Sequence, residues 1–191
     1  MSTDIHEHSC LRDHFLIAMP SLRDPIFCRS LTYICEHSSE GAMGIVINQA
    51  LNLRMAEVFR QLKIHNPERE AAGQRVLAGG PVNTERGFVL HPNEGKWKSS
   101  LAVTPEVCLT ASQDILSAMA AGEGPTHAQF ALGYAGWTAG QLEQELSENS
   151  WLTLPADHNI LFDTPIEQRW AAVSRRLGVN MDLISSVAGH A

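Results

Sequence analysis

The sequence predicts a single α+β domain, and three observations support this fold class. The chain has 191 residues, a length typical of one domain. Strand-like apolar runs occur in pairs, followed by a helical pattern and then by further strands. Strands and helices therefore do not alternate as they would in a doubly wound parallel sheet. Hydrophobic residues make up 44% and charged residues 18% of the chain, a composition that suits a packed core.

The first half of the chain is expected to contribute mostly strands. Residues 1–12 are polar and are expected to form a flexible tail, so that the folded domain spans residues 13–191. Two strand-like runs separated by turn residues predict a hairpin over 31–37 and 42–49. The other elements expected here are a strand at 14–19, a helix from Leu53 capped by Asn52, exposed polar residues at 63–74, and strands at 75–81 and 87–91.

The second half is expected to add helices. Pro105 indicates that a strand at 101–109 is bent or lies at an edge of the sheet. Thr138 and Gln141 form a T-x-x-Q capping box, which predicts a helix up to about residue 149. The remaining elements are a helix at 110–124, a strand at 127–137, extended segments at 151–156 and 159–163, a helix at 164–177 closed by Gly178, and a short helix at 181–189.

The charge distribution disfavours a nucleic-acid-binding protein. The formal net charge is −7, and no lysine or arginine occurs between Lys98 and Arg169. DNA affinity comes largely from cations that neutralise phosphates, so this chain is a poor candidate for a conventional DNA binder. The alternative, a direct DNA-binding regulator, would need a basic groove, built from Arg54, Arg60, Lys63 and Arg69, or from the one compact cluster, Arg169, Arg175 and Arg176.

Composition also predicts a cytoplasmic protein. No apolar run approaches the roughly 18 residues of a membrane span. The N-terminal stretch has neither the basic nor the apolar region of a secretion signal. The four cysteines lack a CxxC spacing, as expected for reduced thiols. We therefore expect no membrane partner. Because no cofactor motif and no metal-ligand spacing occurs in the sequence, we also expect no cofactor and no bound metal.

Five blocks of sequence, in order, resemble the YqgE/AlgH family. They are FLIAMP (15–20) with Asp24 and Phe27, YICEHSSEGAMGIVIN (33–48), GGPVNTERGFVLH (79–91), GYAGWTAGQLEQELSENSWL (133–152), and a closing RW…LG…GHA. The resemblance covers nearly the whole chain after residue 13. It implies a single α+β domain with a barrel-like, branched sheet surrounded by helices. The AlgH name implies a regulator of transcription, in the setting of exopolysaccharide production. The family is of largely unassigned biochemical function. The resemblance therefore does not identify any catalytic residue or cofactor in this chain.

The stretch GYAGWTAGQLEQEL, residues 133–146, is the principal candidate for a ligand site. A strand, a glycine-rich turn and a helix N-terminus can together present backbone amides to a small anion. The candidate ligand-binding residues here are Gly133, Tyr134, Gly136, Trp137, Thr138, Gly140 and Gln141. In the structural interpretation, the glycines permit a bulge or tight packing and Trp137 belongs to the core. The sequence favours that interpretation, because the segment lacks a cation and its spacing matches neither GxGxxG nor GxxxxGK[ST].

Two other blocks supply further candidate residues. Gly79 and Gly80 form a Gly-Gly-Pro turn, and Arg86 could supply the missing cation if the fold brings the blocks together. The favoured interpretation is structural: a shaped loop in which Arg86 pairs with an acid near Glu85 or with Asp24. Cys35 and His37 are expected on one face of their strand, where they could act as nucleophile and base. A buried Cys35 and a hydrogen-bonded His37 are the favoured interpretation.

The acidic helix 141–149 is a candidate surface for a protein partner. It is expected to present three carboxylates outward, those of Glu143, Glu145 and Glu148, either to solvent or to a basic protein. The sequence thus predicts a regulatory or accessory protein that acts through an unidentified protein partner or a small anionic ligand, with any effect on transcription indirect. The alternative to binding is an enzyme that uses the glycine turn with Arg86 and His37, which the sequence does not favour.

Overall fold

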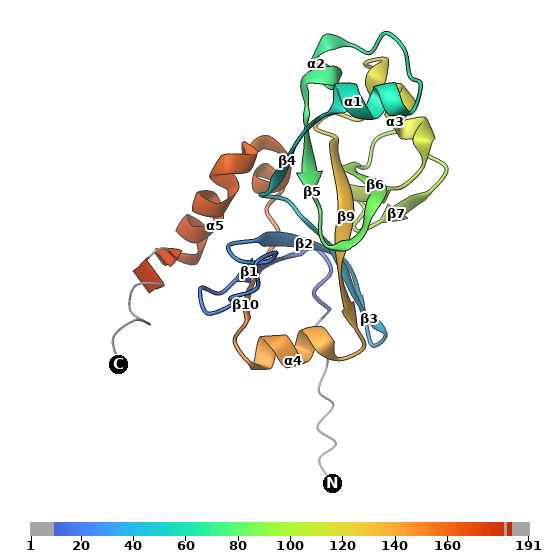
Figure 1. Cartoon of the computed structure of the whole chain (residues 1–191). Coiled ribbons are helices and arrows are strands. Elements are labelled where there is room, and N and C mark those ends of the chain that lie inside the picture. Colours follow the sequence, from blue (N-terminus) through green and yellow to red (C-terminus); the bar gives the residue numbers. More distant parts are fainter. Residues whose placement is uncertain (1–9, 182, 185–191) are drawn as a thin grey trace.

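One strand, β9 (Gln129–Thr138), organises the sheet because it pairs with three others. The computed structural model describes residues 10–181, 183 and 184 (Figure 1). The first part of β9 pairs in parallel with β5 (Arg75–Ala78) and antiparallel with β6 (Val82–Pro92). The second part pairs antiparallel with β3 (Gly41–Val46). The two parts meet at Gly133, whose φ of 73° lies in the left-handed region. The sheet therefore branches at this glycine.

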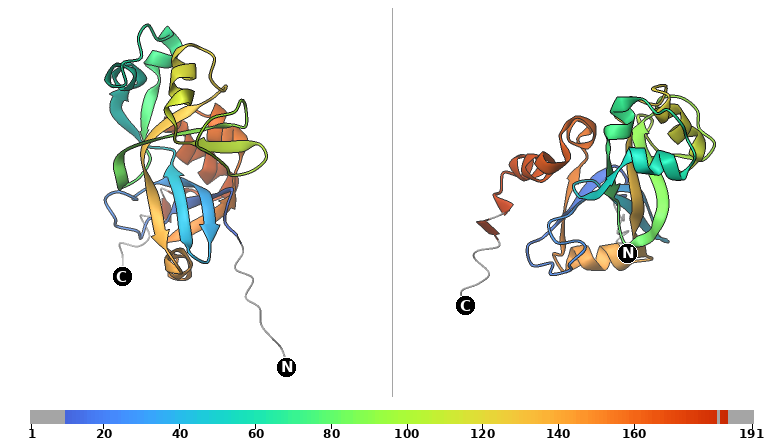
Figure 2. Two further views of the ribbon diagram at one scale, coloured as in Figure 1. Left: turned by 90° about the vertical axis from the view of Figure 1, so that its right-hand side faces the viewer. Right: turned by 45° about the horizontal axis from the view of Figure 1, so that its top comes forward.

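The sheet is a curled, mostly antiparallel half-barrel, as its strand order and two further views show (Figure 2). The order is β10-β1-β2-β3-β9-β6-β8-β7, and β4 pairs only with β5. The strands not yet defined are β1 (His14–Ala18), β2 (Leu31–Ser38), β4 (Ala50–Arg54), β7 (Ser100–Ala102), β8 (Val107–Thr110) and β10 (Trp151–Pro155). The predicted α+β domain with a barrel-like, branched sheet is confirmed.

Helices cover the sheet in three places, and a separate apolar core lies at each of these places (Figure 1). Phe59, Ile115 and Phe130 belong to the core beneath the first three helices. Trp137 and Trp151 belong to the core beside α4. The central core lies on the α5 side. The helices are α1 (Met55–Gln61), α2 (Arg69–Gly73), α3 (Gln113–Ala120), α4 (Gln141–Ser147) and α5 (Arg169–Leu177), with a π-helical turn at Asn159–Asp163 and a 3-10 turn at Ile166–Gln168.

Several local predictions were wrong where tertiary pairing overrides the local pattern. Residues expected to cap and begin the first helix instead form β4, so α1 begins at Met55 with Arg54 as its N-cap. The single strand expected at 101–109 is a hairpin of two strands, β7 and β8. The extended segment expected at 159–163 is the π-helical turn, and α2 lies within the exposed polar stretch expected at 63–74.

The N-terminal boundary of the folded part differs from the prediction, whereas the end of α5 agrees with it. Leu11 was assigned to the flexible tail, but its side chain is buried and its N–H donates to His37 Nδ1 at 2.9 Å. The folded part therefore includes residues 11 and 12. Gly178 closes α5 in the left-handed conformation, as predicted. Of the expected short helix at 181–189, residues 182 and 185–189 lie outside the described part.

A buried histidine connects three strands through hydroxyl groups. His91 of β6 is 1% exposed, and its Nδ1 lies 2.6 Å from the Pro92 carbonyl oxygen. Its Nε2 lies 2.7 Å from Thr110 Oγ1, which in turn lies 2.6 Å from Ser100 Oγ. A carbonyl only accepts, so Nδ1 carries the proton and Nε2 accepts from Thr110. Burial lowers the pKa of His91, and the bond to Pro92 opposes this in part.

The lowered pKa of His91 predicts a loss of stability in mild acid. In the unfolded chain His91 has the ordinary pKa of about 6.5, so below that pH the unfolded state binds more protons than the folded state. The free energy of unfolding should therefore fall as the pH drops through about 6.5. His91→Gln should show a smaller fall between neutral pH and mild acid, measured by urea denaturation. An equal fall in both proteins would contradict the assignment.

Candidate functional site

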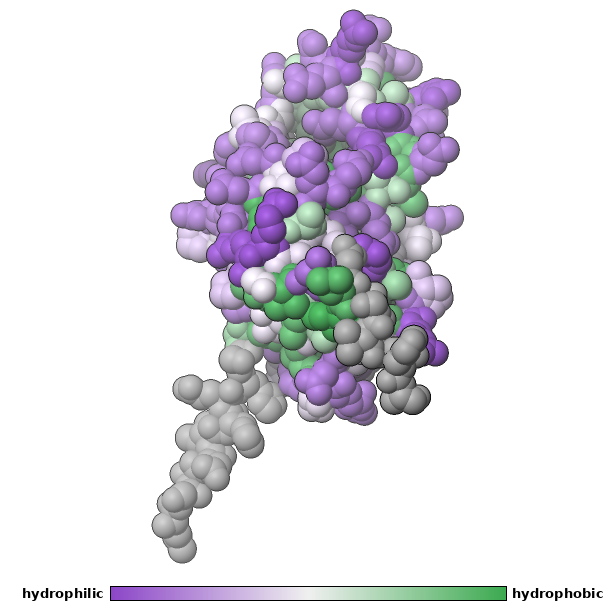
Figure 3. Space-filling view, turned by 90° about the vertical axis from the view of Figure 1, so that its left-hand side faces the viewer, coloured by the Kyte–Doolittle hydropathy of each residue, from purple (hydrophilic) through white to green (hydrophobic). Residues whose placement is uncertain are grey.

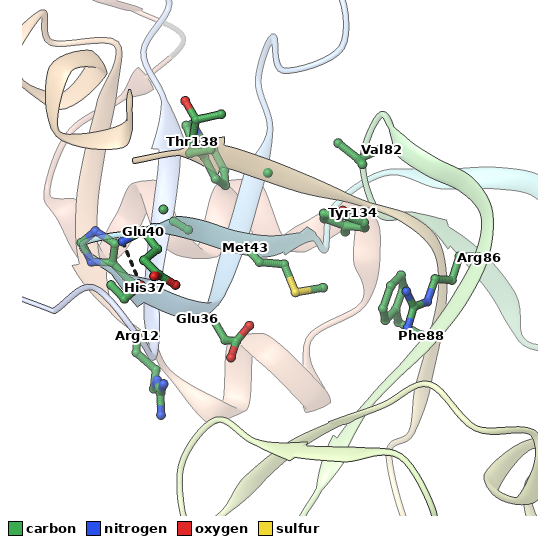
Figure 4. Close-up of a pocket in the computed structure, with 15 residues that line it drawn as sticks. Arg12, Glu36, His37, Glu40, Met43, Val82, Arg86, Phe88, Tyr134 and Thr138 are labelled. Carbon is green, nitrogen blue, oxygen red and sulfur yellow. Dashed lines mark hydrogen bonds between the residues drawn. The ribbon is translucent and has the colours of Figure 1, made fainter. Parts of the chain in front are cut away.

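A groove of about 710 Å³ crosses one face of β2, β3 and β9 and reaches β6 (Figure 4). Strand register places Glu36, Met43 and Gly136 in one row across these strands. Side chains alternate along a strand, so this row faces the groove while the neighbouring row faces the opposite side. That neighbouring row contains His37 and Trp137. The sheet is thus covered by α4 on one face and open on the other.

The groove has an apolar centre and charged sides. Met43 and Tyr134 are half-buried and lie between the two sides (Figure 4). Arg86 lies on the β6 side, and Glu36 and Glu40 lie on the β2–β3 side. The remaining lining residues are Arg12, His37, Ser38, Gly41, Ala42, Val82, Phe88, Gly136, Trp137 and Thr138. The groove therefore offers Arg86 on one side, two carboxylates with Arg12 near them on the other, and a sulfur and an aromatic ring between the two sides.

Aromatic rings hold Arg86 in place. Its guanidinium carbon lies 5.2 Å from the centre of the Phe88 ring, and that ring meets Tyr134 edge-on at 5.7 Å. Among the described residues Arg86 makes no ion pair with a carboxylate. The pairing with Asp24 is not formed; Asp24 Oδ1 accepts the N–H of Ile26 at 2.8 Å. Arg86 therefore presents a positioned, unneutralised cation to the groove.

The glycines of the predicted site serve packing more than binding. A Cβ on Gly79 would lie 2.3 Å from the Gly133 oxygen, and a Cβ on Gly80 would lie 2.1 Å from the Tyr134 carbonyl carbon. A Cβ on Gly133 would lie 2.3 Å from the Gly80 oxygen. These three glycines let the β5–β6 turn touch the β9 backbone, and none of them lines the groove. Their geometry supports the structural interpretation of both glycine-rich blocks.

The N-terminus of α4 is not built as an anion site. The Thr138 N–H, expected to hold the anion, donates to Gln141 Oε1 at 3.0 Å. Gly140 precedes the helix in the left-handed conformation, and α4 has only seven residues, with Glu143 in its first turn. Neither Gly140 nor Gln141 lines the groove, whereas Tyr134, Gly136, Trp137 and Thr138 do.

His37 and Cys35 do not form a nucleophile and its base. His37 Nδ1 accepts the Leu11 N–H, and Nε2 lies 2.7 Å from Glu143 Oε1, so both ring nitrogens are occupied on the α4 side. A β-bulge between Ile34 and Glu36 separates the two residues, and Cys35 lies in the central core. Burial raises the pKa of the Cys35 thiol, which makes it a poor nucleophile.

The acidic face of α4 is largely turned inward. Glu145 Oε2 accepts the indole N–H of Trp137 at 2.9 Å and that of Trp151 at 2.8 Å. Glu143 bonds His37, so of the three predicted carboxylates only Glu148 is exposed. The expected outward acidic surface was therefore wrong for Glu143 and Glu145, which hold α4 against the sheet.

Two of the three arginines in the compact basic cluster are buried or paired. Arg169 is 3% exposed and donates to the Ile47 carbonyl and to Gln129 Oε1, each at 2.7 Å. Burial lowers the pKa of Arg169 to about 10. Arg176 pairs with Asp157. Only Arg175 of the cluster remains exposed without an ion pair within the described part of the chain, too few cations for a nucleic-acid surface.

No group of three or more His, Cys, Asp or Glu side chains suited to a metal ion occurs within the described residues. Figure 3 shows a gathering of hydrophobic residues on the face turned to the left in Figure 1. The large hydrophobic side chains exposed among the described residues are Ile26, Val179 and Leu183. We assign no site to this face.

Five lining residues that define the groove chemically were not predicted as site residues. Arg12 lies in the expected tail, and Glu36, Glu40, Met43 and Phe88 lie in expected strands or turns. The available signal was the alternation within the predicted hairpin, which places Glu36 and Met43 on the face opposite His37. That alternation identifies a site only when the pairing of β3 with β9 is also known.

Comparisons with known proteins agree with the fold. The family described as AlgH-like (DUF179) matches residues 15–182. A UPF0301 protein from Saccharophagus degradans is 60% identical over 185 residues, covering 97% of this chain and 91% of the relative. One from Thioalkalivibrio sulfidiphilus is 56% identical over 179 residues, covering 94% and 96%.

Solved structures give the same assignment. The solution structure of the AlgH protein from Pseudomonas aeruginosa matches with a TM-score of 0.80 and 49% identity over 100% of both chains. A Corynebacterium diphtheriae crystal structure, 20% identical, shares the fold with a TM-score of 0.68, covering 92% of this chain and 91% of that one. Within the described residues, no helix is long and apolar enough to cross a membrane. The chain therefore belongs to the AlgH-like family, together with the UPF0301 proteins that it matches.

Proposed function

We propose that the protein is a cytoplasmic accessory protein that acts by binding, and that its binding site is the groove over β2, β3 and β9. The observation that carries this proposal is the contrast between the two faces of the same strands. One face is closed by α4 through bonds such as that between His37 and Glu143. The other face leaves Met43, Tyr134 and Arg86 lining an open groove.

The occupant that fits this groove best is an extended segment of a partner protein. Methionine and aromatic side chains adapt to varied apolar surfaces, and both types lie at the groove centre. Arg86 on one side would pair with an acidic residue, and Glu36 and Glu40 on the other would pair with a basic one. We therefore expect a segment with a large apolar residue between residues of opposite charge. An effect on transcription would then be indirect, through that partner.

The geometry favours binding over catalysis. His37 lines the groove without offering it a ring nitrogen, because both ring nitrogens contact Leu11 and Glu143 on the α4 face. The cysteine of the same block lies in the core. The groove thus holds charged and apolar recognition groups without a positioned nucleophile and base among the described residues.

Selection from a library of random peptides displayed on phage tests which residues the groove recognises. We expect the unmodified protein to enrich segments that place an acidic and a basic residue on either side of a large apolar one. Tyr134→Ala and Arg86→Gln should each weaken binding of an enriched peptide about tenfold, the effect of losing one central contact worth about 1.4 kcal/mol.

The matched control is Arg60→Gln, because Arg60 is an exposed arginine on α1 that does not line the groove. Its affinity for the peptide should equal that of the unmodified protein. Enriched peptides that bind both groove variants at full strength would contradict the proposal. Enrichment of anionic small molecules in a parallel screen, with no peptide bound, would replace the protein partner by a small ligand.

A further inference from the structure

A second cavity lies on the other side of β6, between α1 and α3. Its volume is about 250 Å³, and it is independent of the groove. Side chains alternate along β6, so Arg86 and Phe88 face the groove whereas Glu85, Gly87 and Val89 line this cavity. The two sites are therefore back to back on one strand.

The cavity has an apolar body. Gly87 helps to shape it, because a Cβ there would lie 2.5 Å from the Phe130 ring. The apolar lining comes from α1, α3 and the strands, namely Leu53, Val58, Leu62, Val89, Leu116, Phe130 and Leu132. An apolar cavity of about 150 Å³ is large enough to bind benzene. This one has room for a ring system somewhat larger than a single benzene ring.

The polar groups of the cavity select the charge of its ligand. Of the lining residues, Glu85 alone carries a charge, and it is exposed. The other polar lining residues are neutral, namely Gln61, Thr110, Ser112 and Gln113. Thr110 Oγ1 already bonds His91 and Ser100. A carboxylate or phosphate would meet a like charge and no cation, whereas an amine would meet Glu85.

We propose that this cavity binds a small amine with an apolar, ring-sized body. The body packs against Leu62, Leu116 and Phe130. The ammonium group lies at the exposed rim beside Glu85. This ligand differs in class from the peptide segment expected in the groove, so either site can fail without the other.

Three compounds that share an indole ring test the proposal: tryptamine, neutral indole and indole-3-propionate. Each is titrated into the uniformly ¹⁵N-labelled full chain and followed by two-dimensional NMR. We expect tryptamine to bind with a dissociation constant below about 1 mM, indole more weakly and indole-3-propionate most weakly. The shifted amides should cluster in α1, α3 and the Glu85–Val89 part of β6.

Substitutions test the binding of the ligand's apolar body and of its ammonium group separately. Leu62→Trp should fill the cavity and abolish binding of all three compounds. Glu85→Gln should weaken tryptamine three- to fivefold, the effect of losing an exposed ion pair worth about 0.6–1 kcal/mol, and should leave indole unchanged. Glu70→Gln is the control, because Glu70 is an exposed carboxylate on α2 that does not line the cavity.

Three results would overturn the proposal. They are the absence of shifts with tryptamine, shifts that map to the groove residues Met43 and Tyr134, or equal affinity for tryptamine and indole-3-propionate. The mapping uses the unmodified protein, so it decides the question even if Leu62→Trp does not fold.

Discussion

Replacing Gly133 by alanine is expected to lower the free energy of unfolding by about 3 kcal/mol. A non-glycine residue in the left-handed region costs about 1–2 kcal/mol. The added Cβ would also lie 2.3 Å from the Gly80 oxygen, which is backbone and cannot rotate away. The β5–β6 turn would have to separate from β9 at the point where the sheet branches. For a domain of this size the melting temperature should fall by roughly 6–12 °C.

Substitutions at two other glycines distinguish the conformational cost of the left-handed backbone from the steric cost of the added Cβ. Gly140 has a φ of 75°, but a Cβ there meets nothing within 4 Å, so Gly140→Ala should show the conformational cost alone. Gly73 in α2 has open space and no positive φ, so Gly73→Ala should be neutral or slightly stabilising. Thermal unfolding of the three variants provides the comparison. Equal losses for Gly133→Ala and Gly140→Ala would show that the close approach of Gly80 contributes nothing.

Replacing Glu145 by alanine is expected to cost about 2–4 kcal/mol. Its Oε2 accepts both indole N–H groups, and the two tryptophans are only 6% and 4% exposed. A buried donor left without an acceptor costs about 1–3 kcal/mol. The tryptophan rings pack edge-on against each other at 6.0 Å, so their fluorescence should report the loss directly.

Glutamine at this position distinguishes hydrogen bonding from charge. Glu145→Gln keeps a carbonyl oxygen that can accept both N–H groups, so its cost should be well below that of alanine. Glu148→Ala is the control on the same helix, because Glu148 is exposed, and its effect should stay within about 0.5 kcal/mol. Urea denaturation followed by tryptophan fluorescence gives all three values. A cost at Glu145 no larger than at Glu148 would contradict the inward role of Glu145.

Local sequence patterns predicted the secondary-structure elements that are determined by neighbouring residues. The hairpin of β2 and β3, the glycine that ends α5 and the helix after Thr138 depend on turn and capping residues that are neighbours in sequence. The predictions that were wrong depend on distant partners. Asn52 looked like a helix cap, but β5 pairs with this segment and draws it into a strand. The extended segment expected at 159–163 is a turn of helix that supplies Leu161 to the central core.

The candidate site could be predicted only in part for the same reason. The sequence predicted three separate candidates, namely His37, Arg86 and the block from Tyr134 to Thr138. The pairing of β9 with β3 and β6 places all three around one groove. Periodicity on helix 141–149 indicated that Glu143 and Glu145 point outward. It could not reveal that His37 and two tryptophans approach that face and turn both carboxylates into internal acceptors.

The most direct test of the groove as the binding site is photo-crosslinking in living cells. A photoreactive phenylalanine derivative is placed at Met43 on the groove floor or, as the control, at Ser117, an exposed position on α3. We predict a discrete crosslinked partner from position 43 alone, through a segment with an apolar residue between opposite charges, and its loss when Tyr134→Ala is added. The same partner captured from position 117, or capture from position 43 that survives Tyr134→Ala, would contradict the proposed function.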